Sequence, residues 1–325
     1  MEFVGKKLIL FQLKFLVIFC RFLGGFPYTA YRKLTRKYLL IPDASRKPKI
    51  FKHNRFWALF SFVFMMGYLA ISILYLFFKK DAKFNKLKGT EKIVAAIIMH
   101  GDWICNKLLV IYFVNNHKRM KKILSKIVRN IKLILAEKLV FDFQYLPFLL
   151  FTLDVIHFIL YNFYFLRVFF KIFNDETKSS VLVFLICRLA LLGPSIWIRY
   201  TISFSFNFSL QVIHTFTNSI ANKCKKLSSN DYYKNEKDLF NEICEQIRVQ
   251  KHNLNVIDKY FLFPISVIIL QTIFHVINYA FSSTDRDSSI FPDPILLSGI
   301  ISSSLYLIIL CNAPDQITRQ VSFYY

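Results

Sequence analysis

Four ionisable side chains interrupt long apolar stretches of the sequence and are the first candidates for chemistry: Asp102, Lys107, Asp154 and Arg188. A charge at the centre of a lipid bilayer costs at least ~2.5 kcal/mol unless it is paired or hydrated. Counted inward from the outer end of each apolar run, Asp102 lies within about one helical turn of Arg188, and Lys107 is level with Asp154. We therefore predict two ion pairs, Asp102–Arg188 and Lys107–Asp154. Such pairs fix helix packing more often than they bind a ligand.

The sequence carries none of the residue patterns that support covalent or metal catalysis. It has no P-loop, no nucleophile–base–acid set, and no CxxC or Cys/His zinc spacing among its six cysteines. We expect no enzyme activity, no metal and no cofactor. The net charge of +23 comes from basic blocks between apolar runs, without a recognition motif for nucleic acid. Membrane lipids with anionic headgroups are the partner that these blocks favour.

The elements that must position the four ionisable side chains are membrane-spanning helices. The chain is 55% hydrophobic and 18% aromatic, with a mean hydropathy of +0.40, which indicates an all-α, polytopic membrane protein rather than a soluble domain. Apolar runs long enough to cross ~30 Å of hydrocarbon predict six spans. Their approximate ranges are 56–78, 93–114, 145–169, 181–203, 261–279 and 294–311.

Charge asymmetry gives these spans an orientation. The segments predicted to lie inside carry about three times as many Lys and Arg as the outer loops, which places both termini in the cytoplasm. Residues 1–55 then form a basic cytoplasmic segment, 56–311 the transmembrane bundle, and 312–325 a cytoplasmic tail. The apolar run that starts at Val181 is too long for one crossing, so 204–260 is predicted to form helical extensions in the cytoplasm.

A stripe of mostly apolar residues follows alternating spacings of three and four through the second of these extensions. This spacing is typical of a helix that packs on another helix and continues into the fifth span. The stripe residues are Phe240, Ile243, Ile247, Gln250, Leu254, Ile257 and Phe261.

Several segments together resemble insect gustatory receptors. They are FLGGFPY at Phe22–Tyr28, IDKYFLFP entering the fifth span, CNAPDQITRQ at Cys311–Gln320, and the long fourth helix. The resemblance implies a seven-span protein of the sensory-neuron plasma membrane, with a cytoplasmic N-terminus. It also implies a tetrameric ligand-gated cation channel, built from the same or related subunits, that detects small-molecule tastants.

The sequence departs from the family pattern at its end. The family's seventh helix lines the pore and carries Thr-Tyr, five apolar residues and Gln-Phe, but here the chain stops at Tyr325 without that signature. We expect the chain to lack the pore helix. Two alternatives to a channel subunit follow: a truncated, non-conducting family member that is a structural or interaction partner or a degenerate product, and, more remotely, an ion-coupled transporter.

By resemblance, the ligand pocket lies between the helices in the outer half of the membrane. Six residues at that depth carry an aromatic ring, an imidazole or a hydroxyl that suits a small, partly apolar ligand. They are His157, Tyr161, His275, Tyr279, Ser298 and Ser302. Because the chain has 37 Phe and 17 Tyr, ordinary packing or lipid contact is the alternative for each of them.

Overall fold

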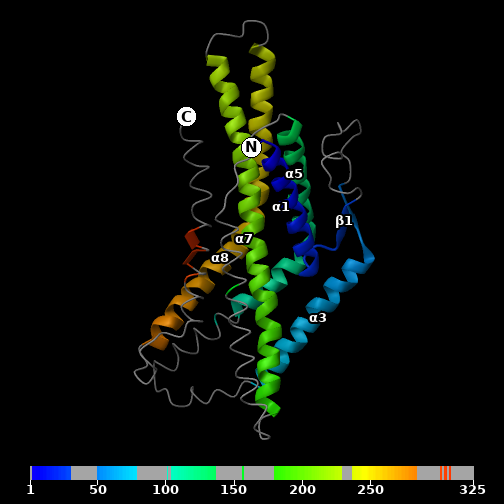
Figure 1. Ribbon diagram of the computed structural model, residues 1–325, viewed down its shortest axis with the longest axis vertical. Helices are drawn as coiled ribbons and strands as arrows, with labels where there is room; N and C mark the ends of the chain where they lie inside the picture. Colours follow the sequence, from blue (N-terminus) through cyan, green and yellow to red (C-terminus); the bar gives the residue numbers. More distant parts are fainter. Residues whose placement is uncertain are drawn as a thin grey trace.

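Two very long helices, α7 and α8, form the axis of the molecule in the computed structural model (Figure 1). The structure describes residues 2–30, 50–78, 101, 104–136, 156, 179–228, 236–283, 301, 304–305 and 307–308. Its labelled elements are α1 (Glu2–Phe22), β1 (Tyr28–Ala30), β2 (Phe51–His53), α3 (Arg55–Phe78), α5 (His117–Ala136), α7 (Ser179–Ser228) and α8 (Glu236–Ser283). A further short apolar helix covers Ile104–Asn115.

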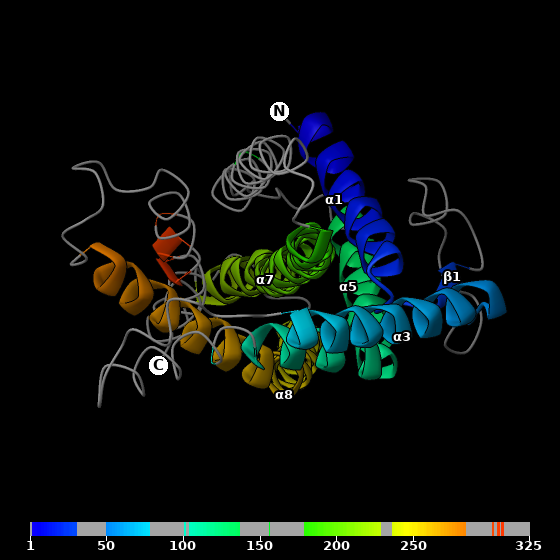
Figure 2. The ribbon, with the colours of Figure 1, turned by 90° about the horizontal axis from the view of Figure 1, so that it is seen from below.

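Helix α7 is the central element, and its 50 residues extend about 75 Å at 1.5 Å per residue. Helices α1, α3, α5 and α8 surround it (Figure 2), and every side chain from 198 to 213 is buried. Many of these side chains are polar, yet they do not break the helix. Thr201, Ser205 and Ser209 each donate a hydrogen bond to the α7 carbonyl oxygen four residues earlier, which satisfies the hydroxyl locally.

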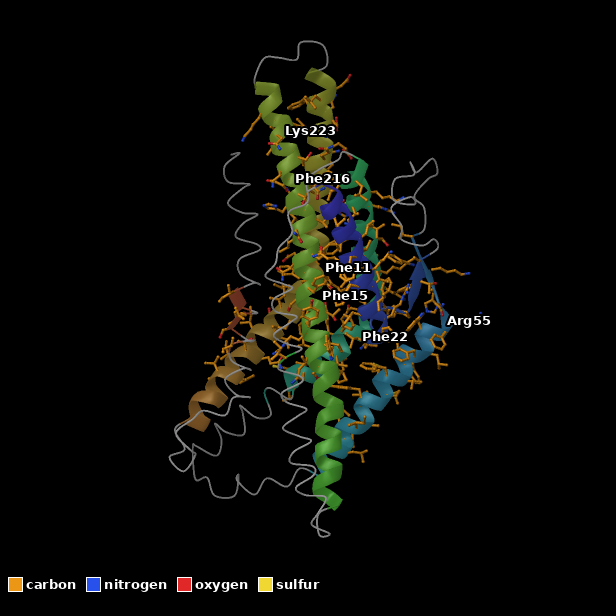
Figure 3. The ribbon with its side chains drawn as sticks, viewed as in Figure 1. Phe11, Phe15, Phe22, Arg55, Phe216 and Lys223 are labelled. Carbon is orange, nitrogen blue, oxygen red and sulfur yellow. The ribbon has the colours of Figure 1, made fainter. Side chains whose placement is uncertain are left out.

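Helix α1 packs on α7 through aromatic rings and an apolar face. Phe15, labelled in Figure 3, lies 6.0 Å from Phe204 between ring centres. The buried face of α1 consists of Ile9, Leu13, Leu16, Val17 and Cys20. Phe11 and Phe22 remain exposed. The apolar face of α1 therefore contacts protein, while a second set of apolar side chains is left for lipid or another surface.

Helix α8 changes direction near Pro264. Its first half runs beside α7, where Lys223 and Glu242 form a 2.7 Å ion pair between the two helices, and its second half diverges (Figure 1). Proline has no N–H, so the carbonyl oxygen of Tyr260, four residues earlier, loses its helical partner. The Tyr112 hydroxyl replaces that partner and donates to the Tyr260 oxygen at 2.5 Å. The bend is thus stabilised from a neighbouring helix.

The predicted stripe on α8 is only partly buried. Its buried members are Ile243, Gln250, Ile257 and Phe261. Phe240 and Ile247 are 57% and 48% exposed, so the prediction that the whole stripe packs on another helix is wrong for these two. At 100° per residue they are rotated roughly 40–60° from Ile243, away from the buried side. The buried face extends in the opposite sense, to Asn253 and Tyr260, because Asn253 hydrogen-bonds Asn130 of α5.

A tight turn and a small antiparallel hairpin join α1 to α3. Tyr28 of β1 pairs with His53 of β2, and these two three-residue strands are an addition to the predicted all-helical fold. Gly24 has φ +74°, a left-handed conformation that favours glycine. A Cβ on Gly25 would lie 2.1 Å from the Phe113 ring, so this position accepts no side chain. The FLGGFPY segment is therefore built for a close approach to the Ile104–Asn115 helix.

Two described helices are long and apolar enough to cross a membrane, Arg55–Leu74 within α3 and Asp238–Phe274 within α8. Half of the twenty residues from Arg55 to Leu74 are exposed and three are buried although the helix is apolar, which suits contact with hydrocarbon. The ranges 145–169 and 294–311 lie outside the described residues except for single positions. The count of six spans and the domain boundaries remain predictions.

Candidate ligand site within the helix bundle

Lys107 lies in a buried polar cluster between α3 and α7. Its Nζ donates to Ser72 Oγ at 2.5 Å and lies 4.2 Å from the centre of the Tyr68 ring. Ser72 Oγ in turn donates to the Tyr68 carbonyl oxygen, so this hydroxyl is used both as donor and as acceptor. The Tyr68 hydroxyl and Ser195 Oγ are 2.8 Å apart, which connects the cluster to α7. One ammonium group thus connects three helices.

The spacing of these residues explains why they meet. Tyr68 and Ser72 are four residues apart and share one face of α3. That face is directed at Lys107, which is only 8% exposed. A buried ammonium is stabilised here by a hydroxyl acceptor and by the negative face of an aromatic ring. Because an ammonium has three donor hydrogens, such a group is able to orient a carbonyl, ether or carboxylate oxygen of a bound molecule.

The segment that carries Lys107 also packs along α8. Gln271 Nε2 donates to Asn106 Oδ1 at 3.0 Å, and both side chains are buried. A Cβ on Gly101 would lie 2.6 Å from the Phe274 ring, so the two helices approach closely at this level. Together with the Tyr112 hydrogen bond, these contacts place residues 101–112 antiparallel to the second half of α8. This segment therefore carries polar side chains on two sides, Lys107 toward α3 and Asn106 toward α8.

Comparison with known proteins identifies the fold. The sequence matches no protein-family model and no curated protein. Its structure matches that of the insect olfactory receptor OR5 from Machilis hrabei in complex with eugenol, with a TM-score of 0.67 and 12% sequence identity. The match covers 98% of this chain and 82% of that receptor chain.

The chain has the insect chemoreceptor fold. Olfactory and gustatory receptors belong to the same insect chemoreceptor superfamily, so the resemblance predicted from the sequence is confirmed at the level of the fold. The predicted class, an all-α helical membrane protein, is confirmed as well. The matched protein is a receptor rather than an enzyme.

Within this chemoreceptor fold, the structure places only one predicted site residue in atomic detail, Lys107. Three others lie on described helices at positions whose side chains are not described: Arg188 on α7, and His275 and Tyr279 on α8. The rest lie outside the described residues: Asp102, Asp154, His157, Tyr161, Ser298 and Ser302. The Gly101–Phe274 approach does bring together the helix segments that directly precede Asp102 and His275. Both predicted ion pairs remain predictions.

Sequence reasoning missed the groups that surround Lys107 in this chemoreceptor fold. Tyr68 and Ser72 carried a usable signal, because they are polar, four residues apart and within a charge-free apolar run. Asn106 and Gln271 carried a weaker one, since single amides within apolar segments often bond across helices in membranes. No signal on α7 distinguished Ser195 from its many neighbouring hydroxyl residues.

The described residues contain no group of three His, Cys, Asp or Glu side chains that would hold a metal ion. What they do contain is an ammonium, hydroxyls and amides that hydrogen-bond one another between helices. This chemistry supports reversible, non-covalent binding, because hydrogen bonds orient a molecule and the surrounding apolar side chains exclude water.

Proposed function

We propose that this chain is a chemoreceptor subunit that binds small, partly apolar molecules inside its helix bundle. The observation that carries the proposal is the fold match over 98% of the chain to a receptor whose structure holds eugenol. Detection of tastants is the finer part of the proposal. It rests on the resemblance of FLGGFPY, IDKYFLFP and CNAPDQITRQ to gustatory receptors.

The residues proposed to line the pocket combine apolar area with polar groups, which suits such ligands. The six polar or aromatic residues predicted for the outer half of the membrane, from His157 to Ser302, supply apolar area and orienting hydrogen bonds. Lys107 and its hydroxyl partners form the inner, polar end. Gating of a cation current by the bound ligand, assembly into a tetramer and residence in the plasma membrane of a sensory neuron are part of the same proposal.

Ligand binding is tested on the purified chain in lipid nanodiscs with a panel of tastants. We expect saturable binding, and Lys107→Met should weaken binding of ligands that carry a carbonyl or carboxylate more than binding of hydrocarbons. Lys223→Met is the matched control, because it makes the same chemical change in a side chain whose ion pair joins the distant ends of α7 and α8. Equal effects of the two variants would contradict a binding role for Lys107.

Whole-cell recording then separates the functional classes. A ligand-evoked cation current, from this chain alone or with related subunits, supports the channel. Binding without any current indicates a non-conducting receptor partner, and ion-dependent uptake of the ligand indicates a transporter. Absence of binding and of current across the panel overturns the chemoreceptor proposal.

A further inference from the structure

Three basic side chains converge on one tyrosine ring at the hairpin between α1 and α3. The His53 and His117 ring centres lie 5.7 and 5.9 Å from the Tyr28 ring centre, and Lys121 Nζ lies 4.7 Å from it. We call these four residues the basic cluster. His53 comes from β2, whereas His117 and Lys121 come from the first turns of α5, which lies beside β1 (Figures 1 and 2).

Tyr28 holds the basic cluster together while the three basic side chains stay accessible. The Tyr28 side chain is 5% exposed, His53 is exposed, and His117 and Lys121 are partly exposed. The His117 Nδ1–H donates to the Val114 carbonyl oxygen at 3.3 Å, which fixes the orientation of this ring. The cluster is therefore a formed surface feature and not a chance meeting of long side chains.

The described residues provide no ion-pair partner for the basic cluster. Within the described part of the chain, no carboxylate forms an ion pair with any of its three basic residues. The adjacent Lys52 and Lys118 are exposed and add positive charge. Lys121 together with the exposed Lys52 and Lys118 makes this surface positive, so an anion bound there would lower the electrostatic energy.

The basic cluster lies where α3 is predicted to enter the membrane. His53 is two residues before Arg55, the first residue of α3, and His117 is two residues after Asn115, where the apolar helix ends. Trp57 lies 6.0 Å from the Arg21 guanidinium, an arrangement typical of the headgroup region. Phe22 is exposed at the same level as Arg55 (Figure 3).

We propose that the basic cluster binds the headgroup of an inner-leaflet lipid that carries phosphomonoester groups. A phosphomonoester has a charge of about −1.5 to −2 at neutral pH and three acceptor oxygens, which matches several donors on one small surface better than a singly charged headgroup. Lys121 supplies a compact charge and the His53 imidazole supplies an N–H donor, while the His117 Nδ1–H stays bonded to Val114. The proposal rests on the predicted membrane crossing of α3 and is independent of channel activity.

The test measures binding of fluorescent phosphatidylinositol bisphosphate to the full chain in detergent micelles. We expect Lys121→Met to weaken binding roughly fivefold, the equivalent of the ~1 kcal/mol that one basic side chain contributes at an anionic membrane surface. Adding His53→Gln to Lys121→Met should weaken lipid binding further, whereas Lys121→Arg alone should retain most of the affinity. Lys251→Met, which removes an exposed charge from α8, is the matched control and should leave binding unchanged.

Competitors distinguish the possible sources of the anion. Phosphatidylserine at matched total charge should compete poorly, and equal competition would overturn the requirement for phosphomonoesters. Soluble inositol trisphosphate that binds as tightly as the lipid would indicate a site for a free phosphate and overturn the lipid proposal. Equal loss of binding in Lys251→Met and Lys121→Met would also overturn it. Size-exclusion profiles confirm that each variant is folded. If Lys121→Met does not fold, the test is decided by Lys121→Arg, which should retain most of the affinity.

Discussion

Replacing Tyr112 with Phe removes a single hydroxyl that serves the backbone of another helix. The hydroxyl donates to the Tyr260 carbonyl oxygen, whose helical partner is missing because residue 264 is proline. The ring itself stays packed, 5.6 Å from the Tyr260 ring and 5.0 Å from the Phe263 ring. Tyr260 is 1% exposed, so its carbonyl would be left unpaired at a cost of about 1–3 kcal/mol.

The assay is thermal unfolding of the purified chain, monitored as the loss of the monodisperse size-exclusion peak after heating. A cost of 1–3 kcal/mol corresponds to a fall in Tm of roughly 2–12 °C in a domain of 150–250 residues, and somewhat less in this longer chain. Unfolding of membrane proteins is often irreversible, so wild type and variant are heated on one schedule.

A second substitution isolates the hydrogen bond from other effects of losing the hydroxyl. Pro264→Ala supplies the N–H that Tyr260 lacks, so Tyr112→Phe should cost less in that background than beside Pro264. The hydroxyl also contacts Arg119, and the cycle subtracts that contact because it is lost in both backgrounds. Equal falls in Tm with and without Pro264 would refute the role of Tyr112 at the bend.

Three further predictions concern stability and use the same unfolding assay. Gly25→Ala should cost about 1–3 kcal/mol because its Cβ would overlap the buried Phe113 ring, whereas Gly67→Ala, with open space around it, should be neutral or stabilising. Lys126→Met should raise Tm near neutral pH, because burial and then two neighbouring cations lower the Lys126 pKa in the folded state. The destabilisation of the folded state by charged Lys126 is full below the lowered pKa and vanishes above the ordinary value of 10.5. A Tm difference between Lys126→Met and wild type that stayed the same at high pH would contradict this prediction. Lys223→Met should change stability by less than ~1 kcal/mol, since its ion pair with a glutamate of α8 is partly exposed, and a larger loss would contradict that reading.

Hydrophobic patterning predicted the framework because length and polarity are local properties. The charge-free run after Arg55 corresponds to α3, and the overlong apolar run after Val181 continues as α7 to Ser228. The bend at Pro264 was not predicted. Its carbonyl is satisfied by Tyr112, which is 148 residues away, and only the packed structure reveals that partner.

Only one residue of the candidate site was predictable, Lys107, whose burial as a charged group costs the most free energy. A lysine within an apolar run is conspicuous, so Lys107 was found, but the Ser72 hydroxyl that accepts from it and the linked Tyr68–Ser195 pair belong to other helices. Helical spacing does not tell which neighbour a face will meet. The same limit explains the exposed Phe240 and Ile247, because a 3.6-residue repeat defines a stripe and not the edge at which burial ends.

The self-bonded hydroxyls of α7 have a mechanical consequence. Thr201, Ser209 and Thr215 donate to their own helix, so these donors do not fasten α7 to its neighbours. Dispersion contacts between apolar side chains exchange gradually, whereas a bond between helices must break before either one moves. Bonds between α7 and other helices include that of Ser195 with Tyr68 of α3 and the ion pair of Lys223 with Glu242 of α8. The hydroxyls of Thr201, Ser209 and Thr215 thus stabilise α7 itself and set no fixed register with the helices around it.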